Sequence, residues 1–424
     1  MSGFGCIILA AGKGTRFFSD TPKVLHDLHG KPVLQHVLDT AKSAGFGRPI
    51  VVVGRGSAAL ERFLKGRAEP VVQKRQLGTA DAVKSAERQL SKYDDIAVLY
   101  GDVPLVRQQT LKSLVASHKA SGVSCTVLTV DMADPSGYGR IVRGPFGGDI
   151  EAIVEEKEAS AEERKIREIN VGLYCFDRRD LFGAIRKIRR SKVKKEYYLT
   201  DAVAILISGG KRVRAFKTGD PDESIGMNSR SDLANAYSII SRRKSAELNK
   251  GSVTVLDPSS TFIAPDARIG RDTVIYPFTV IEKDVVIGRR CSIGPFCRLR
   301  PGTVIEDGAE VGNFVEIVRS TLGSRSKAKH LTYLGDSVIG KGANIGCGTI
   351  TANYDGRKKS RTSVGDKAFI GSGTVLVAPV KIGAGAITGA GSVVLKNKNV
   401  PARSVAVGVP ARILDRSKNK KGKR

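Results

Sequence analysis

Aliphatic residues recur at every sixth position in the second half of the chain. The uninterrupted series consists of Ile263, Ile269, Ile275, Ile281, Ile287, Ile293, Leu299, Ile305, Val311 and Ile317. A helix repeats every 3.6 residues and an amphipathic strand every second residue, so neither gives a period of six. The period is typical of a β-helix, in which each coil has three short faces and one inward aliphatic residue on each face. The pattern therefore predicts a hexapeptide-repeat solenoid.

The sixfold spacing is lost twice after Ile317. The first interruption contains SRSKAKHLTY (324–333) and the second contains TANYDGRKKSRT (351–362). A regular solenoid is mainly scaffold, so we expect functional residues where its regularity fails. The polar and aromatic candidates in these stretches are His330, Tyr333, Asn353 and Tyr354. Because an imidazole can accept a proton near neutral pH, His330 is a candidate general base.

Apolar runs alternate with helix-spaced runs in the first half. Strands are predicted at 5–10, 49–54, 96–100, 123–130, 150–155 and 168–176, and helices at 32–45, 79–90, 108–120 and 197–207. This alternation is typical of a Rossmann-like α/β domain with a largely parallel sheet. Such sheets bind ligands at the carboxyl ends of their strands. The loops that begin at Ala10, Gly54, Val72 and Tyr100 are therefore candidate ligand loops.

The chain is strongly basic. Its 424 residues carry a formal charge of +28, with basic runs at 186–195 and 415–424. A positive field attracts anionic substrates, and clustered lysine and arginine also bind nucleic-acid backbones. Neither run contains interleaved aromatic residues. This favours a solvated helix end and a basic, disordered tail over a specific nucleic-acid site.

Cysteine usage and hydropathy set the expected compartment. Cys6, Cys125, Cys175, Cys291, Cys297 and Cys347 form no CxxC pair, which argues for reduced thiols and against a zinc site. No apolar run is long enough to cross a bilayer, and the N-terminus lacks the basic segment of a signal peptide. We therefore expect a cytoplasmic protein without a membrane span.

The loop after the first predicted strand reads LAAGKGTRFFSDTPK. Gly12 and Gly14 can turn backbone N–H groups toward one point, which makes an anion site. Lys13, Arg16 and Lys23 add positive charge suited to a polyphosphate. The loop matches neither G-x-x-x-x-G-K-[ST] nor G-x-G-x-x-G, so it belongs to another class of phosphate-binding loop.

Asp102 follows a predicted strand in YGDVPL. A polyphosphate site needs cations that relieve the repulsion between its negative charges. A carboxylate at a strand end is a suitable oxygen ligand for Mg²⁺. Asp102 is therefore a candidate metal ligand.

Several motifs resemble one family of sugar-1-phosphate nucleotidyltransferases. LAAGKGTR with the following PK, QLGTADA, YGDVPL, GYGRI, EIN and YYLTD are similar to the bacterial family that combines UDP-N-acetylglucosamine pyrophosphorylase with glucosamine-1-phosphate N-acetyltransferase. The resemblance covers nearly the whole chain. It implies a nucleotidyltransferase domain at 1–229, a linker helix at 230–250, a left-handed β-helix acetyltransferase domain at 251–414 and a tail at 415–424.

The resemblance also implies the residues of the uridylyltransferase site. It assigns the uridine end to Leu9, Ala10, Ala11, Gly12, Gln73, Gly78 and Thr79. It assigns the phosphates to Lys13, Lys23 and the catalytic Arg16, and N-acetylglucosamine to Tyr100, Gly101, Gly139, Glu155 and Asn170. Asn228 is implied as the second magnesium ligand beside Asp102.

For acetyl transfer, the resemblance implies a homotrimer with sites between neighbouring subunits. His330 would accept the proton and Glu316 would orient it. The sugar phosphate would bind Arg300, Tyr333, Asn344, Asn353 and Tyr354, and acetyl-CoA would contact Cys347, Ser372 and Ala390. Backbone N–H groups at 346–348 are suited to stabilise an oxyanion.

Two positions depart from the family pattern. Val318 stands where the family has a phosphate-contacting lysine, although Arg319 is adjacent. Around Gly408 this chain lacks an arginine that contacts CoA in the family, and Arg412 is the nearest basic residue. Both departures concern acetyl transfer and leave the uridylyltransferase motifs intact.

The sequence leaves two alternative functions open. One is a nucleotidyltransferase for another sugar-1-phosphate with a purely structural β-helix, against which the HLTYLGD and TITANYDG stretches argue. The other is a non-catalytic nucleic-acid-binding scaffold, suggested by the basic charge. Release of CoA that depends on His330 distinguishes the bifunctional enzyme from both alternatives.

Overall fold

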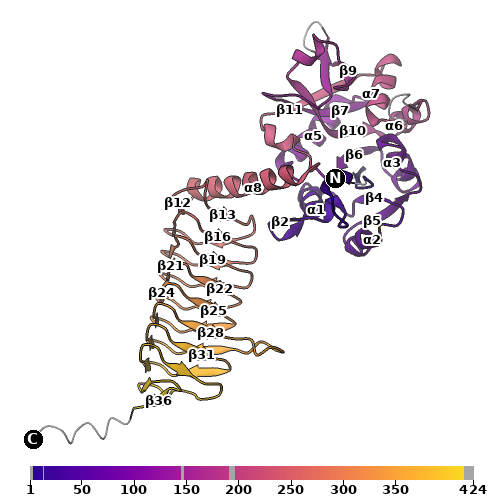
Figure 1. Cartoon of the computed structure of the whole chain (residues 1–424). Helices are drawn as coiled ribbons and strands as arrows, with labels where there is room; N and C mark the ends of the chain where they lie inside the picture. Colours follow the sequence, from indigo (N-terminus) through magenta and orange to yellow (C-terminus); the bar gives the residue numbers. More distant parts are fainter. Residues whose placement is uncertain (1–2, 13, 145–147, 191–195, 415–424) are drawn as a thin grey trace, which may run out of the picture. The chain divides into compact units, whose positions relative to one another are not determined.

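A computed structural model describes residues 3–12, 14–144, 148–190 and 196–414. Contacts divide the chain into two compact units, Met1–Ala236 and Tyr237–Arg424. The division falls inside the long helix α8 (Arg230–Lys250), which matches the predicted linker helix (Figure 1). Within the described residues, no helix is both long and apolar enough to cross a membrane.

The first unit is built on a mixed sheet in the order β11-β7-β10-β6-β1-β4-β5, with a β8–β9 hairpin attached to β10. Its strands are β1 (Phe4–Leu9), β4 (Ile50–Gly54), β5 (Glu69–Gln73), β6 (Asp95–Tyr100), β7 (Cys125–Asp131), β8 (Arg140–Arg143), β9 (Ile150–Val154), β10 (Glu168–Asp177) and β11 (Val213–Thr218). Strands β6, β1, β4 and β5 run parallel, whereas β10 is antiparallel to both β6 and β7. A small separate pair is formed by β2 (Asp27–Leu28) and β3 (Lys31–Pro32).

Helices cover both faces of this sheet. They are α1 (Val33–Ser43), α2 (Ala58–Leu64), α3 (Thr79–Ser85), α4 (Glu87–Leu90), α5 (Gln108–Ser121), α6 (Arg178–Ile185) and α7 (Leu199–Ser208), with 3-10 turns at Thr15–Phe17, Lys23–Leu25, Glu163–Lys165 and Pro221–Ser224. One apolar core joins the sheet to α1, α2 and α5, and a second joins it to α3, α6 and α7. The single helix predicted over 79–90 is divided at Ala86, whose dihedral angles (φ −103°, ψ 9°) are not helical. The α/β prediction is otherwise confirmed.

The second unit is a β-helix in which three sheets are each built from parallel strands of successive coils (Figure 1). The β12 sheet contains β12 (Thr254–Val255), β15 (Val274–Ile275), β18 (Ser292–Ile293), β21 (Glu310–Asn313), β24 (Lys327–His330), β27 (Asn344–Ile345), β30 (Phe369–Ile370), β33 (Ile387–Thr388), β35 (Val405–Val407) and the antiparallel β36 (Arg412–Ile413). The β13 sheet contains β13 (Phe262–Ile263), β16 (Val280–Ile281), β19 (Arg298–Leu299), β22 (Glu316–Val318), β25 (Tyr333–Gly335), β28 (Ile350–Ala352), β31 (Val375–Val377) and β34 (Val393–Val394). The β14 sheet contains β14 (Arg268–Ile269), β17 (Val286–Ile287), β20 (Val304–Ile305), β23 (Thr321–Leu322), β26 (Ser337–Ile339), β29 (Thr362–Val364) and β32 (Val380–Ile382).

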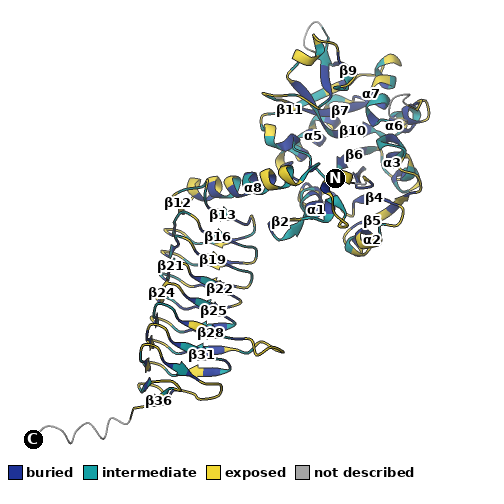
Figure 2. Ribbon diagram, viewed as in Figure 1, coloured by how far each residue is buried: buried dark blue, intermediate teal, exposed yellow. Residues whose placement is uncertain are grey.

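The predicted aliphatic ladder forms the core of this unit. Nine of its ten residues are buried, and Ile269 at the end near α8 is partly buried (Figure 2). The prediction of a hexapeptide solenoid is therefore confirmed.

The prediction that the ladder breaks at 324–333 is wrong. Leu322 and Ala328 continue the inward series to Leu334, and both are fully buried. Two effects hide this continuity in the sequence, because the step from Ile317 to Leu322 is five residues and the next rung is a small alanine. His330 therefore lies in a stretch that keeps the sixfold step, from Leu322 through Ala328 to Leu334.

From Ile263 onward, all irregular steps fall on one corner of the β-helix, the corner that leads from the β13 sheet to the β14 sheet. The inward positions there are spaced by five residues at 317–322 and at 334–339, and by thirteen residues at 351–364. We call this the β13–β14 corner. The long step carries the loop 353–361, which leaves the coil near β28 (orange in Figure 1). The other two corners keep the sixfold step from Ile269 to Ala406.

We predict that Ile293→Ala destabilises the β-helix by about 2–5 kcal/mol, because it leaves a cavity in a fully buried position. The matched control is Val304→Ala, at an outward and 37 % exposed position, which should change stability by less than about 0.5 kcal/mol. Urea unfolding followed by circular dichroism measures both. Equal shifts of the two midpoints would contradict the assignment of inward and outward faces.

Candidate functional sites

A cavity of about 490 Å³ opens at the carboxyl ends of β1, β5 and β6 in the first unit. The predicted site residues in its lining are Leu9, Ala10, Ala11, Gly12, Lys23, Gln73, Gly78, Thr79, Tyr100 and Asp102. The structure thus brings these residues together from sequence positions that are far apart. Lys13 lies outside the described residues. Sequence reasoning did not single out Gln76 and Glu196, which also line the cavity, although Gln76 begins the QLGTADA motif.

Close backbone approaches shape the loop after β1. Gly14 has a left-handed conformation (φ 62°), and a Cβ atom there would lie 2.7 Å from the Cβ atom of Lys23. On the other side of the loop, Gln76 Nε2 donates to the carbonyl of Ala11 at 2.5 Å. A Cβ atom at Gly54 would lie 2.4 Å from that same nitrogen. The glycines therefore let Lys23 and Gln76 hold the loop from both sides.

The start of α3 is fixed by the segment before α7. A Cβ atom at Gly78 (φ 109°) would lie 2.4 Å from the Tyr197 carbonyl oxygen, so only glycine fits. The Tyr197 backbone donates to Leu77 O at 2.7 Å and accepts from Ala80 N at 3.0 Å. Gln73 Nε2 donates to Gly78 O at 3.1 Å. These contacts preset the wall of the cavity.

Asp102 and Asn228 lie close together beneath the glycine loop. The Asp102 carbonyl accepts from Met227 N at 2.7 Å, which brings Asn228 beside it. Lys23 Nζ lies 2.5 Å from Asp102 Oδ2, and Arg16 donates to Asn228 Oδ1 at 2.9 Å. A carboxylate and an amide oxygen fit the donor preference of Mg²⁺. Among the residues described, no group of three or more His, Cys, Asp or Glu side chains could hold a metal.

The residues expected around N-acetylglucosamine adjoin this cavity but, apart from Tyr100, are not part of its lining. Asn170 N donates to Gly139 O at 2.9 Å, and Asn170 Nδ2 donates to the Tyr174 hydroxyl at 2.7 Å. Gly101 N donates to Leu9 O at 2.9 Å. Glu155 accepts from Thr200 at 3.2 Å.

Burial raises the pKa of the Tyr100 phenol, and nearby Asp102 and Glu155 raise it further against the opposing hydrogen bond with Thr79. Tyr100 is therefore protonated at neutral pH and can donate a hydrogen bond.

In the second unit, four predicted residues form a column on the corner between the β12 and β13 sheets. The backbone carbonyl oxygens of His330, Cys347 and Ser372 each accept a hydrogen bond from a backbone N–H of the next coil. The donors are Gly348 at 3.4 Å, Gly373 at 2.7 Å and Gly391 at 2.7 Å. Ala390 precedes the last of these glycines. The three glycines have positive φ, a conformation that glycine adopts without steric cost.

A second predicted group lies on the β13 sheet and the β13–β14 corner. Glu316 and Tyr333 are neighbours in register, and Arg300 Nη1 lies 2.7 Å from Glu316 Oε1. Asn353 is buried at the start of the loop 353–361, whereas Tyr354 is 60 % exposed and donates to Gly356 O at 2.7 Å. Asn344 lies on the β12 sheet beside Lys327.

Glu316 does not contact His330 within the described part of this chain. Its carboxylate instead pairs with Arg300, while His330 is exposed at the end of β24. The expected orienting contact is therefore not made among the described residues of this chain. His330 and Asn353 also lie on different corners, so one chain does not bring the two groups of acetyltransferase candidates together.

Comparisons with known proteins agree with both units. Residues 6–195 match the MobA-like NTP transferase domain, and residues 266–301, 284–319 and 361–396 match the bacterial transferase hexapeptide repeats. The chain is 43 % identical to bifunctional protein GlmU of Syntrophomonas wolfei over 95 % of this chain and 96 % of that protein. It is 43 % identical to that of Geobacillus thermodenitrificans, over 95 % and 94 % of the two chains. It is 42 % identical to that of an Exiguobacterium species, over 98 % of both chains. With likeness at this level along both units, the chain belongs to the family of bifunctional GlmU proteins.

Proposed function

We infer that this chain is a bifunctional enzyme of UDP-N-acetylglucosamine synthesis. The β-helix transfers acetyl from acetyl-CoA to glucosamine-1-phosphate, and the first unit then transfers uridylyl from UTP to N-acetylglucosamine-1-phosphate. The observation that carries this proposal is the cavity beneath the glycine loop, where Lys23, Asp102 and the α3 start converge. The intact column at His330 supports the second activity.

Uridylyl transfer is a single displacement at phosphorus. A phosphate oxygen of N-acetylglucosamine-1-phosphate forms a bond to the α-phosphorus of UTP, and the bond from that phosphorus to the bridging oxygen breaks to release pyrophosphate. Gln73, Gly78 and Thr79 hold the uridine end. Arg16 and Lys23 face the phosphates and offset their repulsion. Mg²⁺ held by Asp102 and Asn228 would neutralise further phosphate charge, and binding it would free both basic side chains for the nucleotide.

Acetyl transfer is attack by an amine on a thioester. The C2 amine of glucosamine-1-phosphate bonds to the acetyl carbon, His330 accepts a proton from the amine, and the CoA thiolate leaves. Backbone N–H groups near Gly346–Gly348 are suited to stabilise the oxyanion. Cys347, Ser372 and Ala390 would lie along the acetyl-CoA. Arg300, Tyr333, Asn344, Asn353 and Tyr354 would hold the sugar phosphate.

The acetyltransferase site is shared between subunits of a homotrimer. This assembly is supported by the separation of His330 from Asn353 on two corners of one chain. A neighbouring copy that presents its β13–β14 corner to the His330 column would complete the site. In the same arrangement, a carboxylate or a loop of the neighbouring chain would lie beside His330 and could orient it.

We predict that the two activities can be removed separately. Asp102→Asn should lower uridylyl transfer at least about 100-fold, because it removes a negative ligand and so weakens binding of the metal ion that would offset the phosphate charge. His330→Ala should lower CoA release by about 100-fold or more. Each variant should keep the other activity, measured on the same preparation with thioester and pyrophosphate assays. If the unaltered chain shows no acetyl transfer, so that neither variant can lose it, the result would instead favour a nucleotidyltransferase with a structural β-helix.

We predict that chelation of divalent ions with EDTA abolishes uridylyl transfer and leaves acetyl transfer unchanged. The first site pairs a carboxylate with an amide oxygen, which suits Mg²⁺, and none of the steps given above for acetyl transfer involves a metal. Added Mg²⁺ should restore the activity. Uridylyl transfer that persists after exhaustive chelation would contradict the role given to Asp102 and Asn228.

We predict that acetyl transfer is regained when two inactive chains are produced together. Chains with His330→Ala and chains with Asn353→Ala should each be inactive, whereas mixed oligomers contain some sites with both native residues. Light scattering should give a mass of three 45.3 kDa chains. Mixed oligomers without activity, or a monomer, would contradict a shared site.

A further inference from the structure

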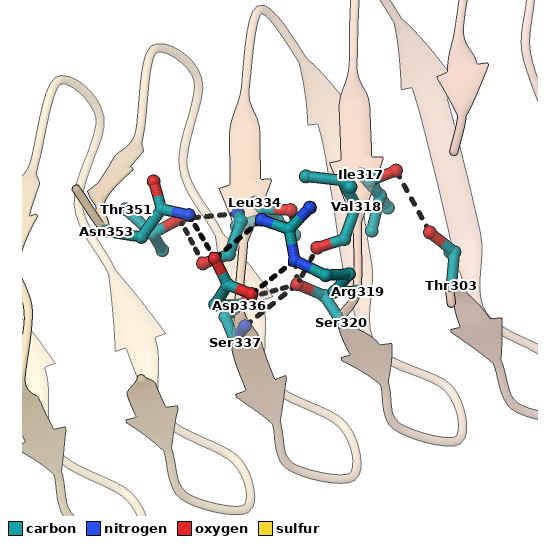
Figure 3. A network of polar contacts seen from close by, with 11 residues as sticks. Thr303, Ile317, Val318, Arg319, Ser320, Leu334, Asp336, Ser337, Thr351 and Asn353 are labelled. Carbon is teal, nitrogen blue, oxygen red and sulfur yellow. Dashed lines mark hydrogen bonds and ion pairs between the residues drawn. The ribbon is translucent and has the colours of Figure 1, made fainter. Parts of the chain in front are cut away.

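Three consecutive coils depart from the sixfold step at the β13–β14 corner, and polar contacts join all three. The first two coils are one residue short, at Val318–Ser320 and Gly335–Ser337, and the third carries the loop 353–361. Figure 3 shows side chains of these coils turned toward one another across the corner. This clustering shows that the three irregularities form one structural unit.

Arg319 and Asp336 are the charged centre of this unit. The guanidinium binds the carboxylate with two hydrogen bonds, 2.6 Å from Nε to Oδ1 and 2.8 Å from Nη2 to Oδ2 (Figure 3). Both residues have left-handed backbones, with φ of 46° and 48°. The paired guanidinium holds the pKa of Asp336 below its usual value. Arg319 is therefore not a free cation that could simply replace the lysine missing at Val318.

Asp336 holds both ends of the loop 353–361. Asn353 Nδ2 donates to Asp336 Oδ2 at 2.5 Å, and Thr362 N donates to the Asp336 carbonyl at 3.2 Å. Ser360 N donates to Asn353 O at 2.8 Å and closes the base of the loop. The segment between these anchors contains Tyr354 and the basic residues Arg357, Lys358 and Lys359.

Close packing leaves Asn353 little freedom in this geometry. A Cβ atom at Gly335 would lie 2.6 Å from Asn353 Nδ2 and 2.6 Å from the Tyr333 hydroxyl. Beneath the pair, Ser320 Oγ donates to Val318 O at 2.8 Å and accepts from Ser337 N at 2.8 Å. The polar groups of the two shortened corners thus bond to one another through Ser320. The carboxylate of Asp336 is the group that holds Asn353 in position.

We propose that Arg319 and Asp336 are a positioning pair for acetyl transfer, which fixes Asn353 and the base of the loop 353–361 in the sugar-phosphate half of the site. The inference rests on the proposed function. The pair acts on the sugar phosphate and not on acetyl-CoA, because Cys347, Ser372 and Ala390 lie on the other corner. A direct contact between Arg319 and the phosphate is the competing role.

Steady-state kinetics of full-length variants separate these roles. Arg319→Met and Asp336→Asn should each raise the KM for glucosamine-1-phosphate about tenfold, within the range of couplings in such networks, with the KM for acetyl-CoA changed less than about twofold. The exchange of charges, Arg319→Asp with Asp336→Arg, should recover part of the loss. If Asp336→Asn binds the sugar phosphate normally while Arg319→Met does not, the direct contact is correct and the proposal fails.

A matched pair controls for loss of an ion pair in the β-helix. Arg289 and Asp307 also join adjacent coils with two hydrogen bonds, at 3.0 and 2.7 Å, but on the corner that leads from the β14 to the β12 sheet. Arg289→Met and Asp307→Asn should leave both KM values unchanged, and an equal effect there would overturn the proposal. Uridylyl transfer in the same samples reports the amount of folded enzyme. If the unaltered chain shows no acetyl transfer, the proposed function fails, whereas active but unaffected variants overturn only the positioning role.

Discussion

Each short strand of the β-helix takes its hydrogen-bond partners from the coils before and after it. A coil must therefore return to the same three faces after every turn, and the backbone pairing between coils tolerates no drift. An inserted or deleted residue has to be absorbed within the corner where it occurs. This constraint explains why the irregular steps after Ile263 share one corner, and why the second short step follows the first on the very next coil.

The same constraint decides what can be read from the sequence. The ladder from Ile263 to Ile317 is visible because each inward position requires an apolar side chain and the step is constant. Beyond Ile317 one missing residue shifts the phase, and Ala328 and Thr351 fill inward positions with residues that do not look like rungs. The sequence therefore predicts the solenoid correctly but suggests a break around His330 that is not there. Contacts such as Arg319 with Asp336 depend on coils seventeen residues apart, a separation visible only once the two short corners are known.

In the first unit, local chemistry was more predictable than side-chain pairing. The motifs of the glycine loop and of the α3 start are recognisable because close neighbours at Gly14 and Gly78 leave no room for a side chain. The partners of those residues come from distant segments, such as Gln76 for Ala11 and Tyr197 for Gly78, and no spacing rule predicts them. Similarly, the carboxylate of Glu316 suggested that this residue orients His330. Glu316 lies on the β13 sheet, however, where it pairs with Arg300.

The loop 353–361 also has a consequence for how this fold changes over evolutionary time. Its two ends enter and leave one coil at neighbouring points held by Asp336, so its length and sequence can vary without moving the strands on either side. The loop at this corner can therefore be replaced while the strands of the β-helix keep their positions. Substrate preference in such a solenoid can thus evolve by replacing one loop, at no cost to the core that the ladder builds.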